Sequence, residues 1–293
     1  MEQLLRPIYQ ERASKQKTLG IIQFEQRENE SSITDTFDWV LLIIVKQSKT
    51  PVFTKHYILG EQKVAMHIVT EKMLHKWLQT GSNRKVIHWV LFGKIMFERD
   101  DYLQKLRLDM QTFPYDGRKM KTGIQFAKLI RRYKEGKEQY AKDNYLDAYI
   151  HVLSAIHHLG RLSVIDSGLY PEVSLWSQVR EIEPAIYKLY EELVFSEETL
   201  EKRLELLFLA SEFFIHSRTE DGAQHILSIL TEQEYWKIQD LHDHHELSYY
   251  SKDLEVFIEY LVEHQYILIE PFISKNGDVM HRYYKINPEK KVK

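Results

Sequence analysis

The sequence contains 293 residues, of which 43% are hydrophobic and 28% charged, so it has enough apolar material for two or three globular domains. Its net charge of −3 provides no overall electrostatic attraction to nucleic acid or to a membrane surface. The absence of cysteine excludes disulfides, cysteine-ligated zinc and thiol catalysis, and is compatible with a reducing cytoplasm.

The N-terminal segment and the longest apolar run bear on localisation. The segment MEQLLRPIYQER has no apolar h-region, so we expect no signal peptide. The longest apolar run, residues 39–45, is far shorter than the roughly 20 residues that span a bilayer. We therefore expect a cytoplasmic protein with no membrane partner.

Residues 1–117 alternate between strand-like and helix-like patterns. The continuously apolar run at residues 38–45 is typical of a strand that is covered on both faces. Further strands are expected from runs of β-branched and aromatic residues at 19–26, 52–59, 63–69 and, as one or two strands, 85–99. Helices are expected at 71–80, before Gly81, and at 100–114. The segment therefore predicts an α/β domain with a mixed sheet.

Residues 118–230 predict an all-α domain, because amphipathic patterns replace the strand patterns. We expect a bundle of five or six helices. Pro184 should kink or split one helix, and Ser196, followed by two glutamates, should start another.

Residues 231–293 predict a small winged-helix-like module. Thr231 and Glu234 have capping-box spacing and should open a helix. The amphipathic segment 251–266 should form a second helix, and two strand-like runs around Asn276-Gly277 predict a hairpin. The whole chain is thus expected to be α+β: a mixed sheet with flanking helices, then a helical bundle, then this module.

The stretch TDTFDWVLLIIV, residues 34–45, resembles the signature of the minimal nucleotidyltransferase fold. In that signature a strand ends in Gly-Ser, and an Asp-x-Asp pair then leads into an apolar strand. Here Glu25-Gln26 stands at the Gly-Ser position, and the Asp-x-Asp alignment retains one aspartate, Asp38. Asp35 is an additional carboxylate. It can converge with Asp38 only across a turn or bulge, because side chains alternate along a strand.

The resemblance implies roles for particular residues. Asp35 and Asp38 would bind Mg²⁺, and Asp38, Asp35 and Glu98 would be the catalytic carboxylates. Glu25, Gln26 and Arg27 would contact a nucleoside triphosphate. The third carboxylate of the signature would fall on the strand at 63–69, whose central polar residue is His67.

The layout of the chain is similar to that of the kanamycin nucleotidyltransferases, in which a helical domain follows the nucleotidyltransferase-like domain. With the winged-helix-like end, nearly the whole chain resembles the bacterial nucleotidyltransferase-like proteins of the YgxA type. This resemblance implies a nucleoside triphosphate with Mg²⁺ in a cleft between the α/β and helical domains, and an unidentified second substrate.

Three functional hypotheses stay open. The first is metal-dependent nucleotidyl transfer, and the second is a non-catalytic interaction or regulatory protein on the same scaffold, motivated by the altered signature. The third is DNA binding through the winged-helix-like module. Its second helix carries Asp253, Glu255, Glu259 and Glu263, which would repel phosphate, so we do not expect a nucleic-acid partner. A packing or homodimer role suits the module better.

Three other sequence patterns bear on function. The basic stretch at 118–137 could line a cleft that faces an anionic substrate, but a solvated helix face is the favoured interpretation. HDHHE at 242–246 and the pair Arg218 and His225 match metal-binding and ribonuclease-like spacings, but such short matches are unspecific. Gly222 also suggests a break between Arg218 and His225.

Overall fold

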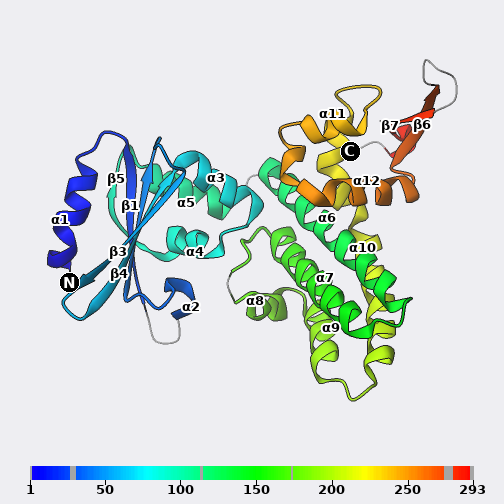
Figure 1. Ribbon diagram of the computed structural model, residues 1–293, viewed down its shortest axis with the longest axis horizontal. Helices are drawn as coiled ribbons and strands as arrows, with labels where there is room; N and C mark the ends of the chain where they lie inside the picture. The colour runs from blue at the N-terminus through cyan, green and yellow to red at the C-terminus, as the bar shows by residue number, and fades with distance from the viewer. Residues whose placement is uncertain (1, 27–30, 113–114, 173, 274–279, 291–293) are drawn as a thin grey trace. The chain divides into compact units, whose positions relative to one another are not determined.

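The computed structural model describes residues 2–26, 31–112, 115–172, 174–273 and 280–290. The chain divides into two compact units. The first consists of Met1–Pro114 with Gly168–Ser174, and the second of Tyr115–Ser167 with Leu175–Lys293 (Figure 1). The short segment Gly168–Ser174 thus belongs with the α/β unit, although it lies within the sequence expected for the helical domain.

The first unit is built on a five-stranded mixed sheet with the order β3-β4-β2-β1-β5. Strands β2 and β4 run parallel, and the other neighbouring pairs are antiparallel. The strands are β1 (Thr18–Glu25), β2 (Trp39–Val45), β3 (Val52–Leu59), β4 (Gln62–Thr70) and β5 (Lys94–Glu98). The mixed sheet expected from the sequence is confirmed.

Helices cover both faces of this sheet, which explains why β2 is apolar throughout. Ile22, Val40 and Leu42 pack on one face against α3 (Glu71–Thr80), α4 (Arg84–Phe92) and α5 (Tyr102–Thr112). Ile21, Leu41 and Ile43 pack on the other face against α1 (Glu2–Ala13) (Figure 1). Because successive side chains alternate, a central strand between two such layers must be apolar at every position.

Of the one or two strands expected at 85–99, one is present as β5, whereas residues 84–92 form helix α4 and no strand. Asn83 caps the helix by accepting a hydrogen bond from the Val86 amide at 3.3 Å. Trp89 anchors the helix by donating from its indole to the carbonyl of Ile33, in the short helix α2 (Ser31–Thr34), at 3.1 Å. Short apolar runs fit either structure, and here tertiary contacts decide for the helix.

Five helices form the bundle of the second unit. They are α6 (Tyr115–Tyr140), α7 (Tyr145–Asp166), α8 (Leu175–Ile182), α9 (Pro184–Phe195) and α10 (Leu200–Leu230). Pro184 occupies the first turn of α9 and splits it from α8, as expected. Helix α10 begins after Thr199, which caps it, rather than after Ser196. It also continues through Gly222, so the expected break there is wrong.

The C-terminal segment forms a helix-turn-helix with a two-stranded wing. Its elements are α11 (Ile238–Asp243), η1 (Leu247–Tyr249), η2 (Ser251–Asp253), α12 (Leu254–Glu263), β6 (Ile267–Ile273), β7 (Met280–Ile286) and η3 (Pro288–Lys290). The expected turn residues Asn276-Gly277 lie outside the described residues, but Ile273 pairs with Met280 across the hairpin. Thr231 caps the C-terminus of α10, so the helix start expected there is wrong.

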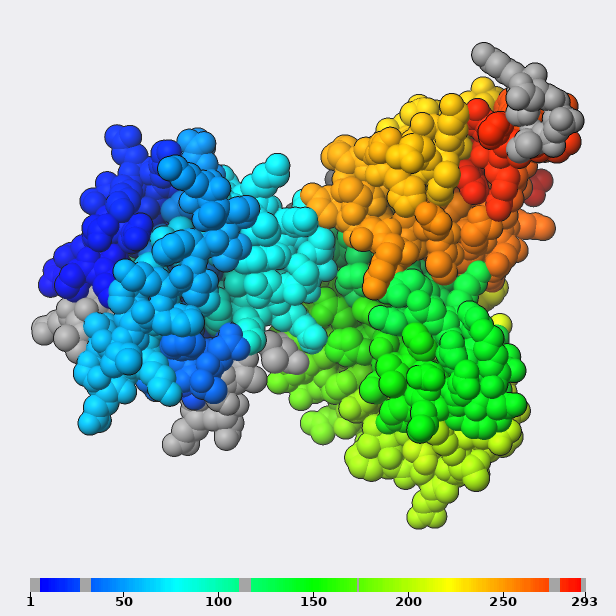
Figure 2. Space-filling model, viewed as in Figure 1, coloured from blue at the N-terminus to red at the C-terminus, as the bar shows by residue number. Residues whose placement is uncertain are grey.

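The bundle and the C-terminal module share one hydrophobic core. Trp236, Tyr250 and Phe257 are buried in the same cluster as Phe126 and Ile226 of the bundle. The segment from α11 to α12, drawn in yellow and orange, accordingly packs directly on the green helices (Figure 2). The α+β class expected from the sequence is confirmed. Within the described ranges, no helix has the length and apolar content needed to cross a bilayer.

Gly123 of α6 and Gly222 of α10 allow this close packing, and Gly222 gives a test. A Cβ on Gly222 would overlap the ring of the fully buried Phe126, whereas a Cβ on Gly117, also helical, would meet no atom within 4 Å. We expect Gly222→Ala to lower the free energy of unfolding by about 1–3 kcal/mol through overpacking. Gly117→Ala should raise it by roughly 0.5–1 kcal/mol, because alanine favours the helix. Urea unfolding measures both, and equal effects would contradict the packing argument.

Candidate functional site

The predicted nucleotide site lies where β1 ends and β2 begins. Glu25, the last residue of β1, pairs with Trp39, and the Gln26 amide donates to the Asp38 carbonyl at 2.9 Å. The Gln26 side chain accepts from the Thr34 hydroxyl at 3.4 Å. Arg27 lies outside the described residues. The structure therefore brings Glu25, Gln26 and Asp38 to one end of the sheet.

The carboxylate of Asp38 is engaged by the sheet. Its Oδ2 accepts from the Lys63 amide at 2.7 Å, while the Asp38 amide donates to the Lys63 carbonyl at 3.0 Å. These bonds extend the pairing of β2 with β4 by one residue. A carboxylate that accepts a backbone hydrogen bond in this way stabilises the sheet, whatever else it contacts.

Asp35 lies in a turn before β2, in the left-handed region with φ 55°, and Thr36 follows with φ 66°. Aspartate tolerates this conformation better than most residues. The turn that convergence of Asp35 and Asp38 requires is thus present. However, the Asp35 carboxylate forms an ion pair with Lys85 of α4, and 60% of its side chain is exposed.

Glu98 lies at the other end of the sheet. Its partner in β1 is Gly20, which in turn pairs with Ile44 of β2. Ile44 is six residues beyond Asp38, which corresponds to about 20 Å along a strand. The Glu98 carboxylate accepts from the amides of Leu103 and Gln104, at 3.2 and 3.1 Å, in the first turn of α5. The structure therefore separates Glu98 from Asp38 and assigns it to a helix terminus.

His67 replaces the third carboxylate of the signature. Its Nδ1 lies 3.0 Å from the Thr54 hydroxyl, and its ring stacks on Trp89 with 5.2 Å between the ring centroids. Burial, together with the neighbouring His56, lowers the pKa of His67, and Asp35 opposes this shift. A neutral imidazole packed on an indole therefore occupies the position where a metal-binding carboxylate would be expected.

These residues do not fit a pair of Mg²⁺ ions. Two-metal chemistry requires carboxylates that converge on both ions. In the part of the chain that the structure describes, no three His, Asp or Glu side chains are arranged to hold a metal. The described segment HDHHE, residues 242–246, forms no such metal-binding group either. His242 pairs with Glu255 at 3.0 Å, and Glu246 pairs with His225 at 2.9 Å.

A polar cavity in the second unit was not anticipated as a site. It has a volume of about 400 Å³ and lies among α6, α7 and α10. Every lining side chain is polar or charged: Arg118, Lys119, Thr122, Asp166, Ser217, Arg218, Asp221 and Gln224. Arg118 and Lys119 belong to the basic stretch, and Arg218 and Asp221 to the segment 218–225, but no sequence pattern connects these two segments with each other or with Asp166.

Part of the basic stretch is buried rather than solvated. Lys121 is only 8% exposed, and burial next to Arg161 lowers its pKa to about 6. The oxygen of Gln125 accepts from Arg161 Nε and is 3.1 Å from His158 Nδ1. Burial and the nearby cations, first among them Lys128, lower the pKa of His158 to about 3. This polar layer joins α6 to α7.

Comparisons with known proteins cover nearly the whole chain. Family models match residues 1–118 (nucleotidyltransferase-like), 119–218 (YgxA-like substrate binding domain) and 224–286 (helix-turn-helix domain). The chain is 47% identical to the uncharacterized protein YgxA of Bacillus subtilis over 284 residues, 97% of each chain. It is also similar to the crystal structure of a nucleotidyltransferase-like protein from Exiguobacterium sibiricum. The TM-score is 0.84 at 38% identity, covering 98% of this chain and 99% of that chain.

The contacts of Glu98 predict a structural role. We expect Glu98→Ala to lower the free energy of unfolding by about 0.5–2 kcal/mol, because α5 loses acceptors at its N-terminus. Glu98→Gln, which keeps an acceptor oxygen, should cost less. Chemical denaturation of the two variants measures the difference. Equal stability of wild type and Glu98→Ala would refute the capping role.

His158 predicts a pH-dependent stability. Its folded pKa lies far below its ordinary value of 6.5, so the unfolded chain binds a proton that the folded chain excludes. The free energy of unfolding should therefore fall as the pH decreases from 6.5 towards 3. We expect a shallower decline in His158→Gln, measured by urea unfolding across this range. His216→Gln, on an exposed position of α10, should keep the wild-type slope.

Proposed function

The chain belongs to the YgxA-like family of nucleotidyltransferase-like proteins, and we propose that it is a ligand-binding regulatory protein on this scaffold. In this proposal the first unit does not carry out metal-dependent nucleotidyl transfer. The helical domain binds a small ligand, and the helix-turn-helix module responds to it.

The separation of the predicted catalytic carboxylates carries the first part of the proposal. Asp38 accepts a sheet hydrogen bond, Asp35 pairs with Lys85, and Glu98 accepts from α5 at the opposite end of β1. Each carboxylate thus has a local structural partner. Nucleotidyl transfer needs the same groups together around Mg²⁺ and the attacking hydroxyl.

The second part of the proposal rests on the helical domain. The family model for residues 119–218 describes a substrate-binding domain, and the polar cavity lies largely within this segment. A volume of about 400 Å³ is in the range of small-molecule sites. We therefore assign ligand binding to the bundle.

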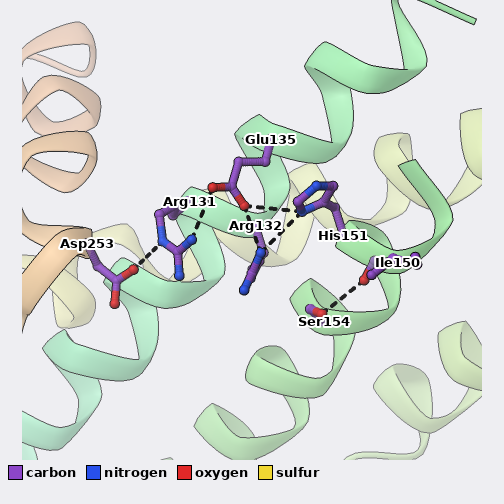
Figure 3. A network of polar contacts seen from close by, with 7 residues as sticks. All are labelled: Arg131, Arg132, Glu135, Ile150, His151, Ser154 and Asp253. Carbon is purple, nitrogen blue, oxygen red and sulfur yellow. Dashed lines mark hydrogen bonds and ion pairs between the residues drawn. The ribbon is translucent and has the colours of Figure 1, made fainter. Parts of the chain in front are cut away.

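The third part concerns the helices that line the cavity, because they also hold the C-terminal module. In α6, Arg131 pairs with Asp253, which is only 3% exposed, and with Glu135 at 3.0 Å (Figure 3). In α10, the Thr219 hydroxyl lies 2.8 Å from that of Tyr260. A ligand that shifts α6 against α10 would therefore change how the helix-turn-helix packs on the bundle. This change in packing is the regulatory step that we propose.

The contacts of α12 favour a packing role over DNA reading. Glu255 pairs with His242, Glu259 with Arg282 of the wing at 2.8 Å, and Glu263 with Lys134 at 2.6 Å. These pairs use wing and α6 cations that a DNA-binding module would direct at phosphate. We propose that the output of the module is a protein contact.

The proposal predicts the outcome of a nucleotide assay. With Mg²⁺ and each of ATP, CTP, GTP and UTP at millimolar concentration, we expect no binding by calorimetry and no nucleoside monophosphate transfer. Asp38→Asn should lower the free energy of unfolding by about 0.5–1.5 kcal/mol, because a neutral amide oxygen is a weaker acceptor for the Lys63 amide than the carboxylate is. Glu61→Gln, an exposed change in the β3–β4 turn, is the matched control.

One result would overturn this proposal: Mg²⁺-dependent binding of a nucleoside triphosphate, or transfer from it, that Asp38→Asn abolishes and Glu61→Gln retains. In that case the carboxylate would serve catalysis in addition to the sheet.

A further inference from the structure

We propose that the polar cavity of the second unit binds a small zwitterion, with its anionic group at Arg118 and Lys119 and its ammonium group at Asp166 and Asp221. This inference deepens the ligand-binding part of the proposed function by naming the chemical class of the ligand.

The lining of the cavity determines the polarity of the ligand. All of its side chains carry charges, hydroxyls or amides, and Thr122 among them is only 7% exposed. An apolar ligand would remove these groups from water without providing hydrogen bonds, which is unfavourable. A small polar molecule that replaces the water in the cavity would satisfy them.

One wall of the cavity is cationic. Arg118 and Lys119 come from the beginning of α6, which starts at Tyr115. The N-terminal turns of a helix also carry a partial positive charge, which adds to that of the two side chains. A carboxylate or phosphate group is complementary to this wall.

The walls from α7 and α10 are anionic. Arg218 compensates them only in part, because its guanidinium also pairs with Glu183, outside the cavity, at 2.6 Å. Its Nε lies 3.4 Å from Asp166 Oδ2, which orients that carboxylate at the end of α7. The carboxylate of Asp221 is held by the amide of Gln224 at 3.1 Å. Because Arg218 is shared between Glu183 and Asp166, the carboxylates of the cavity are only partly compensated and can receive a cation.

The two walls together select a zwitterion over a singly charged ligand. A lone anion would compensate Arg118 and Lys119 but would add repulsion from Asp166 and Asp221. A lone cation would have the converse effect. A molecule with both charges is attracted by both walls, and such complementarity provides specificity.

The protonation of Asp166 supplies an independent readout. Burial raises its pKa to about 6; Arg218 opposes the rise, and the neighbouring Asp221 and Glu183 add to it. An ammonium group beside Asp166 would lower this pKa, so binding should weaken as the pH falls from 7.5 to 5 and should release a proton below about pH 6.

The test is calorimetric titration of the full chain with defined probes. Phosphoethanolamine, glycine, β-alanine and γ-aminobutyrate carry both charges at different spacings, and inorganic phosphate and ethanolamine carry one each. We expect at least one zwitterion to bind at least tenfold more tightly than either single-charge probe. Its affinity should fall at pH 5 with the heat signature of proton release.

Variants locate the site. Asp221→Asn and Arg118→Gln should each weaken binding of that zwitterion by roughly tenfold or more, because each removes the charge opposite one end of the ligand. Glu220→Gln, adjacent to Asp221 but exposed and outside the lining, should bind as wild type. Thermal unfolding verifies that each variant is folded, and the two cavity variants test different walls, so failure of one to fold leaves the other decisive.

Three outcomes would overturn the inference: no binding by any zwitterion, equal binding by inorganic phosphate or ethanolamine alone, or unchanged affinity in a folded cavity variant. These results leave the question of nucleotidyl transfer untouched. Conversely, Mg²⁺-dependent transfer from a nucleoside triphosphate would refute the proposed function and not the zwitterion site.

Discussion

The close crossing of α6 and α10 at Gly123 and Gly222 is the constraint on which the second unit depends. A Cβ at Gly222 would overlap Phe126, and one at Gly123 would overlap the hydroxyl of Tyr250. The two helices therefore approach closely enough to share one core with the C-terminal module. The same two helices also line the polar cavity, so the cavity and the module share one pair of helices.

In the first unit, the carboxylates that the signature singles out have local partners within a nucleotidyltransferase-like scaffold. Asp38 bonds to the β4 backbone, Glu98 bonds to the start of α5, and His67 stacks on Trp89. Each of these contacts stabilises a boundary between elements. A fold can thus be retained after its site has been altered, because sheet register and helix packing depend on apolar residues that the site does not use.

The charges of the second unit are distributed differently from those of a DNA-binding module. The acids of α12 pair with Lys134 of α6, His242 of α11 and Arg282 of the wing. Their pairing helps to hold the module on the bundle, and the polar cavity carries a separate group of charged side chains. This distribution favours a role in which the module transmits the state of the bundle.

The sequence by itself determined the order of domains and most strands. Period and apolarity are local properties, so the runs at 38–45, 52–59 and 63–69 located β2, β3 and β4 to within one residue at each end. The exposed turn at Asp35 was also foreseen as a condition for its convergence with Asp38. Local patterns erred at α4, where β-branched and aromatic residues suit a strand but Asn83 and Trp89 form the contacts of a helix.

Only the tertiary structure determined which residues lie together at a candidate site. Glu98 and Asp38 lie on strands of one sheet, yet the antiparallel register of β1 with its two neighbours places them at opposite ends. Asp166 and Asp221 are remote in sequence, yet the packing of α7 on α10 brings them to one cavity. Strand register and helix crossing depend on contacts between distant segments, and a single sequence encodes these contacts without displaying them.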